Sequence, residues 1–255
     1  MLDKHIAWFK AHAASFLTGA PEYDTHIELK IEHSLAVLAE AKAITPTLAL
    51  SQRLVQAAHL AALYHDIGRF PQYRRYRTFQ DSRSANHAHL GVRALRQEKA
   101  SMPPIDASLR PLVLGGVILH NRRDIPRGIS PELAVVAKIV RDSDKLDITR
   151  VMLDYLRPGG KTSDVVTLHV ADEPEKYSPE IIAQIQSGRI GDYSSMRFKN
   201  DFTLILLSWV NDLNFKASRQ AFLDRGHAEE LFGFLPDVPE IARLKGHIDA
   251  TLRKS

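Results

Sequence analysis

An apolar helix that ends in a histidine and an aspartate is the feature that most constrains this sequence. Ala58 and Ala61 precede His65 on one helical stripe, so the pattern predicts that His65 faces inward beside Asp66. Gly68 can end this helix in the left-handed conformation. An imidazole next to a carboxylate at a buried helix end can bind a metal ion, although most His-Asp pairs are ordinary surface residues. The interpretation therefore depends on whether further ligands occur elsewhere in the chain.

The composition limits the kinds of site that the chain can build. It has 255 residues, enough for one large domain or two modest ones, and it contains no cysteine. Disulfides, thiolate zinc sites and cysteine nucleophiles are therefore excluded, and nitrogen and oxygen must hold any metal. Residues 1–17 are typical of an amphipathic helix and not of a signal peptide or membrane span, so we expect a cytoplasmic protein without a membrane partner. A net charge of +4 is compatible with an anionic partner but does not require one.

Three further histidines lie at inward-facing helical positions. His33 lies between apolar neighbours in a helix expected over residues 22–42, where a hydrogen-bonded core histidine is the alternative to a ligand. His87 begins a helix that Asn86 can cap, whereas His89 falls on the opposite side and is expected at the surface. His120 ends an apolar helix that starts near residue 111.

A long helix is expected from a Ser-Pro-Glu start at residues 130–132 to residue 156. Its apolar stripe includes Asp144, and a carboxylate on such a face needs a partner. Asp147 returns to the same face and could orient a ligand. Asp142 falls on the opposite side, where it would form a solvated charge pair with Arg141, so its replacement by asparagine is expected to be nearly silent.

Arginines alternate with aromatic residues over residues 69–79, which we expect to form a loop. Guanidinium groups bind phosphate oxygens, and aromatic rings can stack on bases. A solvated loop with its rings packed against the domain is the alternative. The position of the segment directly after His65 and Asp66 favours the functional interpretation.

The remainder of the chain carries weaker signals. A Pro-Gly-Gly break at residues 158–160 predicts a domain over residues 1–157 and a mainly helical extension over 158–255. The extension is expected to pack on the domain, with a small separate lobe as the alternative. Within it the sequence predicts a short strand or extended segment at 165–170 and helices at 179–187, 202–213 and 239–253.

The order of His33, His65-Asp66 and Asp144 resembles the signature of the HD-domain superfamily of metal-dependent phosphohydrolases. The blocks at residues 63–69 and 143–146 are similar to the segments that carry the signature in that family. His87 and His120 are similar to the additional histidines of its binuclear members. The Gly-Tyr-Pro block of cyclic-dinucleotide phosphodiesterases is absent after His120. The resemblance covers about residues 30–150 and implies an all-α HD-type helical bundle.

The resemblance also implies a site and an activity. One or two divalent ions (iron, manganese, nickel, cobalt, zinc or magnesium) would be held by His33, His65, Asp66, His87, His120 and Asp144. Asp66 would bridge the two ions, and metal-bound hydroxide would attack phosphorus. Arg69, Lys145 and Arg122 would bind the phosphoryl oxygens, which gives Asp66, Arg69 and Lys145 catalytic roles.

The expected reaction is hydrolysis of a phosphoester or phosphoanhydride in a nucleotide or a related small phosphate. A non-catalytic HD-fold protein that binds a nucleotide and reports it to a partner is the alternative. RNA binding through residues 69–83 is a third and less favoured reading, and strong salt dependence without a need for metal would identify it. The sequence predicts neither the metal, nor the substrate, nor the oligomeric state.

Overall fold

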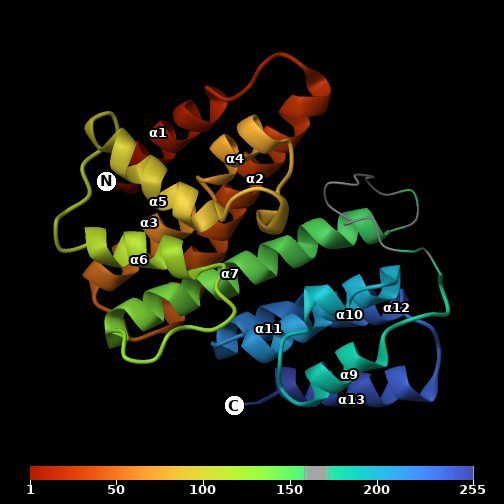
Figure 1. Cartoon of the computed structure of the whole chain (residues 1–255). Helices are drawn as coiled ribbons and strands as arrows, with labels where there is room; N and C mark the ends of the chain where they lie inside the picture. The colour runs from red at the N-terminus through yellow and green to blue at the C-terminus, as the bar shows by residue number, and fades with distance from the viewer. Residues whose placement is uncertain (158, 160–170, 172, 255) are drawn as a thin grey trace. The chain divides into compact units, whose positions relative to one another are not determined.

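The computed structural model describes residues 1–157, 159, 171 and 173–254, in which α-helices are joined by turns, loops and short 3-10 helices (Figure 1). Within these residues the only strand-like pairing is an isolated bridge between Ala171 and Phe198. The all-α prediction is confirmed. Contacts divide the chain into two compact units, Met1–Asp147 and Ile148–Ser255, and the division falls inside helix α7. The helices are α1 Leu2–Ala14, α2 Pro21–Ile44, α3 Gln52–Tyr64, α4 Arg69–Tyr76, α5 His87–Gln97, α6 Arg110–Leu119, α7 Pro131–Leu156, α9 Pro179–Gln186, α10 Lys199–Ser208, α11 Lys216–Asp224, α12 His227–Gly233 and α13 Pro239–Leu252.

Helix α3 forms the centre of the first unit and packs against α1, α2 and α6 (Figure 1). Its buried face consists largely of alanine, which allows neighbouring helices to approach closely. A Cβ atom at Gly116 of α6 would lie only 2.7 Å from the Cβ atom of Ala61, so these two helices touch nearly backbone to backbone. This close contact brings the C-terminal ends of α3 and α6, and the histidine after each, toward one another.

Side chains cap the starts of α3 and α5, and the cap expected at Asn86 is confirmed. The Ser51 hydroxyl accepts a hydrogen bond from the backbone nitrogen of Leu54 at 3.4 Å. The Asn86 side chain accepts one from the backbone nitrogen of His89 at 3.1 Å. Each bond satisfies a backbone N–H that has no partner inside its helix. The cap at Asn86 fixes where α5 starts and makes His87 its first residue.

The expected left-handed conformation of Gly68 is wrong, because its φ is −72°. The glycine is needed here for a different reason. A Cβ atom at Gly68 would lie 2.0 Å from the carbonyl oxygen of His87 and 2.4 Å from the nitrogen of Gly91. The absence of a side chain therefore lets the start of α5 rest directly on the turn that follows His65 and Asp66.

Gly68→Ala is expected to lower the free energy of unfolding by about 1–3 kcal/mol, because α5 must move away to admit the methyl group. Urea unfolding followed by circular dichroism measures this change. Gly246→Ala is the matched control, because nothing lies within 4 Å of a Cβ atom there. That change should be neutral or stabilising by up to about 1 kcal/mol. Equal stability of the two variants would show that α5 does not rest on Gly68.

Residues 69–79 do not form the expected loop, because the first eight of them form helix α4, Arg69–Tyr76. Phe70 and Tyr73 lie three residues apart and are both buried, so packing of one aromatic face stabilises the helix. The helix ends at Arg77, which takes the left-handed conformation with a φ of 56°. Phe70 and Tyr73 therefore pack against the domain, as the alternative interpretation of this segment predicted.

The second unit contains α9 to α13, and every residue of α10 after Lys199 is buried. The helices expected at 179–187 and 239–253 are confirmed as α9 and α13. The one expected at 202–213 begins earlier, as α10, and continues as a 3-10 turn over Trp209–Asp212. Helices α11 and α12 were not predicted, and the segment expected to be extended at 165–170 lies outside the described residues. The division at residues 157 and 158 and the packing of the extension on the domain stay predictions.

Within the described part of the chain, no helix is both long and apolar enough to cross a membrane.

Candidate metal centre

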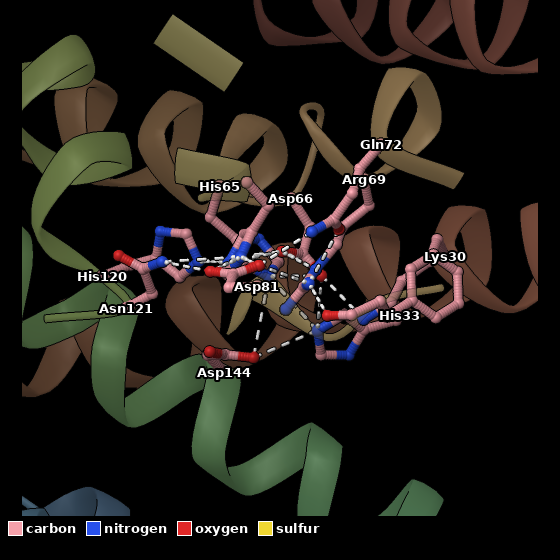
Figure 2. Close-up of polar contacts among 12 residues, drawn as sticks. Lys30, His33, His65, Asp66, Arg69, Gln72, Asp81, His120, Asn121 and Asp144 are labelled. Atoms are coloured by element: carbon pink, nitrogen blue, oxygen red, sulfur yellow. Dashed lines mark hydrogen bonds and ion pairs between the residues drawn. The ribbon is translucent and has the colours of Figure 1, made fainter. Parts of the chain in front are cut away.

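Six predicted ligands from five helices or helix ends converge in the first unit (Figure 2). Five of the six are buried, and Asp144, whose side chain is 26% exposed, opens the cluster to solvent. Three overlapping groups each place one nitrogen or oxygen atom per residue within 4.8 Å of the others. The groups are His33, His65 and Asp66; His65, His120 and Asp144; and Asp66, His87 and His120.

Each of the four histidines uses its Nδ1 atom in a hydrogen bond to an oxygen acceptor. The acceptors are the Asp147 carboxylate for His33 at 2.7 Å, the Ala62 carbonyl for His65 at 2.8 Å, the Asp81 carboxylate for His87 at 2.8 Å and the Val117 carbonyl for His120 at 2.7 Å. A carbonyl or an ionised carboxylate can only accept, so Nδ1 carries the proton and donates. In the neutral ring this leaves the Nε2 lone pair free, which is the arrangement of a metal-binding histidine.

The free nitrogens point at one another. Nε2 of His87 lies 2.9 Å from Nε2 of His120, and Nε2 of His33 lies 3.2 Å from Nε2 of His65. Two lone pairs at this distance repel each other unless a proton or a metal ion lies close to both. Nitrogens about 2.1 Å from an octahedral ion and adjacent to each other around it are separated by about 3.0 Å. The buried cluster therefore fits divalent metal ions.

The Asp66 carboxylate lies between the two histidine pairs, with His33, His65 and His120 around it in Figure 2. Its Oδ2 atom is 3.7 Å from Nε2 of His33 and 3.8 Å from Nε2 of His65. Its Oδ1 atom is 3.4 Å from Nε2 of His87 and 3.7 Å from Nε2 of His120. One oxygen thus faces each pair, which is the geometry a carboxylate needs to serve two neighbouring ions.

Asp144 lies next to the histidine pair His33 and His65. Its Oδ1 atom lies 3.1 Å from Nε2 of His33 and 3.6 Å from Nε2 of His65. Burial would raise the pKa of Asp144, but its hydrogen bond with His33 and the nearby histidines hold that pKa well below the ordinary value. The carboxylate is therefore ionised and able to bind a cation at neutral pH.

Burial keeps two of the histidines neutral, since it lowers the pKa of His65 to about 4 and that of His87 to about 3. Burial acts in the same direction on His33. There, however, hydrogen bonds to Asp144 and Asp147 raise the pKa instead. A metal ion at His33 would have to displace any proton on Nε2, so binding there is expected to release protons.

Two side-chain cations contact the Asp66 carboxylate. The Lys30 ammonium lies 2.8 Å from Oδ2, and Nε of Arg69 lies 3.3 Å from Oδ1. Burial would raise the pKa of Asp66, but Lys30 and then Arg69 hold it well below its ordinary value. Lys30 was not predicted, although it lies one helical turn before His33 and so shares its face of α2.

Asp81 holds His87 and its neighbours in place, and it was also not predicted. Its carboxylate accepts hydrogen bonds from His87 at 2.8 Å, Gln72 at 2.9 Å, Arg69 at 3.2 Å and Asn121 at 3.2 Å. Burial would raise the pKa of Asp81, but these partners, His87 first, lower it to about 2. The ionised carboxylate fixes the proton of His87 on Nδ1 and connects α4 with the ends of α5 and α6.

The predicted phosphate-binding residues occupy different environments. Arg69 reaches the cluster and also donates to the side chain of Gln72 at 2.9 Å and to the carbonyl oxygen of Phe79 at 2.5 Å. Lys145 is buried beside Asp144, with 9% of its surface exposed. Arg122 is exposed in the segment that follows His120. Arg69 contacts the ligand candidate Asp66, with its Nε atom 3.3 Å from Oδ1.

The expectation that Arg141 and Asp142 form a solvated pair is wrong. Asp142 is fully buried and Arg141 is 2% exposed. The Arg141 guanidinium donates to the carbonyl oxygens of His120, at 3.3 Å, and of Arg122 and Arg123. Arg141, Asp142 and Ser143 are all buried, so α7 is covered on the side that the sequence predicted to face solvent. Arg141 instead holds the chain where it leaves α6 and so positions His120.

Asp142→Asn is therefore not expected to be silent. Loss of a fully buried carboxyl group should lower the free energy of unfolding by about 1–3 kcal/mol. Urea unfolding measures the effect, with Asp124→Asn as the control because Asp124 is exposed. If both variants unfold at the wild-type urea concentration, the buried environment of Asp142 contributes nothing to stability.

Comparisons with known proteins agree with this geometry. A family model described as HD domain matches residues 31–149, which include all six predicted ligands. The searches found no match among curated proteins and none among solved structures.

Proposed function

We propose that this chain, which matches the HD-domain family model over residues 31–149, is a metal-dependent phosphohydrolase of the HD-domain superfamily. The substrate would be a phosphoester or phosphoanhydride of a nucleotide or a related small phosphate. One observation carries the proposal: four buried histidines direct their Nε2 atoms toward one another beside two ionised carboxylates. A buried arrangement of this kind is costly without a cation and favourable with one.

The proposed ligands divide into two groups around Asp66. His33, His65 and Asp144 face its Oδ2 side, whereas His87 and His120 face its Oδ1 side. The first group would hold one divalent ion and the second group another. Asp144 leaves the first group open to solvent, so a phosphate can reach it.

A divalent ion in such a centre lowers the pKa of a coordinated water and withdraws charge from phosphoryl oxygens. The residues around it would orient the substrate and stabilise negative charge. Arg69 is positioned for this role at the edge of the cluster, where a bound phosphate could take over its bonds. Lys145 and Arg122 would act on more distant oxygens of the same substrate.

Metal analysis followed by a phosphate-release screen tests the proposal. Protein purified without chelator is expected to contain iron, manganese, nickel, cobalt, zinc or magnesium. Loaded with each ion in turn, it should release phosphate from one or more nucleotides, and treatment with EDTA should abolish the release. Metal-dependent nucleotide binding without hydrolysis of any tested phosphate would instead identify a regulatory nucleotide-binding protein.

A further inference from the structure

Lys30 is a buried lysine whose only described hydrogen bond is to Asp66. The residue is 8% exposed, and its Nζ atom lies 2.8 Å from Asp66 Oδ2. An ammonium group in such a place is stable only while an anion lies next to it. In the structure Asp66 is that anion.

The same oxygen atom faces His33 and His65, at 3.7 and 3.8 Å. A divalent ion held by these residues would therefore draw Oδ2 toward itself and place two positive charges close to Lys30. Lysine has no lone pair with which to bind the ion while it is charged. Once metal is bound, the ammonium needs another anion.

The surroundings of Lys30 indicate where that anion would lie. Its Nζ atom is 5.3 Å from the centre of the Phe79 ring, and the Arg69 guanidinium carbon is 5.8 Å from the same centre. Lys30 of α2 and Arg69 of α4 thus both lie near the half-buried Phe79 ring. They contact different oxygens of Asp66 (Figure 2). An anion that contacts both cations would lie against the metal cluster.

We propose that Lys30 is a substrate-binding residue, which exchanges the Asp66 carboxylate for a phosphoryl oxygen when the metal centre is filled. This inference rests on the proposed function and names the ligand group: a phosphate dianion bound jointly by Lys30 and Arg69. No bond is made or broken in the exchange. Lys30 would thereby couple the two ligands, since it opposes metal binding in the free protein and favours phosphate binding in the loaded one.

The test measures Mn²⁺ affinity and then the affinity of the Mn²⁺-loaded full chain for inorganic phosphate, both by calorimetry. Lys30→Met should bind Mn²⁺ more tightly than wild type, by about tenfold, because a competing charge is removed. The same variant should bind phosphate about 10- to 100-fold more weakly, because a charge-assisted hydrogen bond is lost. Lys30→Arg should restore most of the phosphate affinity. Lys42→Met, which removes an exposed lysine of the same helix, should match wild type in both measurements.

The outcomes separate this inference from the proposed function. If Lys30 only stabilises the position of Asp66, Lys30→Met will bind Mn²⁺ more weakly and bind phosphate normally once loaded, which overturns the inference. Unchanged phosphate affinity in a fully loaded, folded Lys30→Met protein overturns it as well. In either case the hydrolase proposal stands. Failure of the wild-type protein to bind Mn²⁺ or any other divalent ion would overturn both.

Discussion

Asp66→Ala is expected to abolish hydrolysis and to remove nearly all bound metal. The substitution deletes both the oxygen that faces His33 and His65 and the one that faces His87 and His120. Loss of a residue that merely orients a metal ligand costs about 10- to 100-fold in affinity. Loss of a carboxylate shared by two ions should cost more. Metal content by mass spectrometry and phosphate release per chain measure the two effects.

The variant is also expected to lose stability, because the Lys30 ammonium would remain buried without its partner. Removing one member of a buried ion pair costs about 3–5 kcal/mol. Asp66→Asn keeps the shape of the side chain and so separates loss of charge from loss of packing. Glu28→Ala, an exposed carboxylate on α2, should behave as wild type. Full phosphatase activity of either Asp66 variant with added Mn²⁺ would show that the centre is assigned to the wrong residues.

The second large effect is expected at His120, which distinguishes a binuclear centre from a mononuclear one. His120→Ala should lose the ion that faces Oδ1 of Asp66 and retain the ion that faces Oδ2. In Mn²⁺-loaded protein the magnetic coupling between two ions that share a carboxylate should then vanish from the electron paramagnetic resonance spectrum. Metal stoichiometry should fall from two per chain to one.

His89→Ala is the control for this experiment, because His89 is an exposed histidine two residues after His87. If His120→Ala keeps the full metal content and only turnover falls, His120 acts on the substrate and not on an ion. A wild-type chain saturated by one ion, with excess metal and phosphate present, would exclude the binuclear centre and leave the hydrolase proposal intact.

The helices that carry the site could be predicted because their signals are local. An apolar stripe with a repeat of 3.6 residues identifies the inward side of a helix from its own residues alone. This repeat was sufficient to predict that His87 is buried and His89 exposed, and to place His120 at a helix end. It was not sufficient at Asp142, because α7 is buried on both sides there and the stripe no longer distinguishes inside from outside.

Contacts between elements could not be predicted in the same way. Lys30 meets Asp66 only because α2 packs against α3, and nothing in a single helix predicts that approach. Asp81 lies in a 3-10 turn, where no repeat indicates which way a side chain points. The sequence predicted a left-handed, helix-ending conformation for Gly68, whereas in the structure this glycine allows close backbone contact with α5. In each case the decisive neighbour lies on another element.

A crystal structure of the Mn²⁺-loaded protein, with data collected at the manganese absorption edge, tests the central claim most directly. We expect one anomalous peak among His33, His65, Asp66 and Asp144 and a second among Asp66, His87 and His120. The four Nε2 atoms and both oxygens of Asp66 should lie about 2.1–2.3 Å from the ions. Crystals soaked to saturation that show no ion at either position would contradict the account.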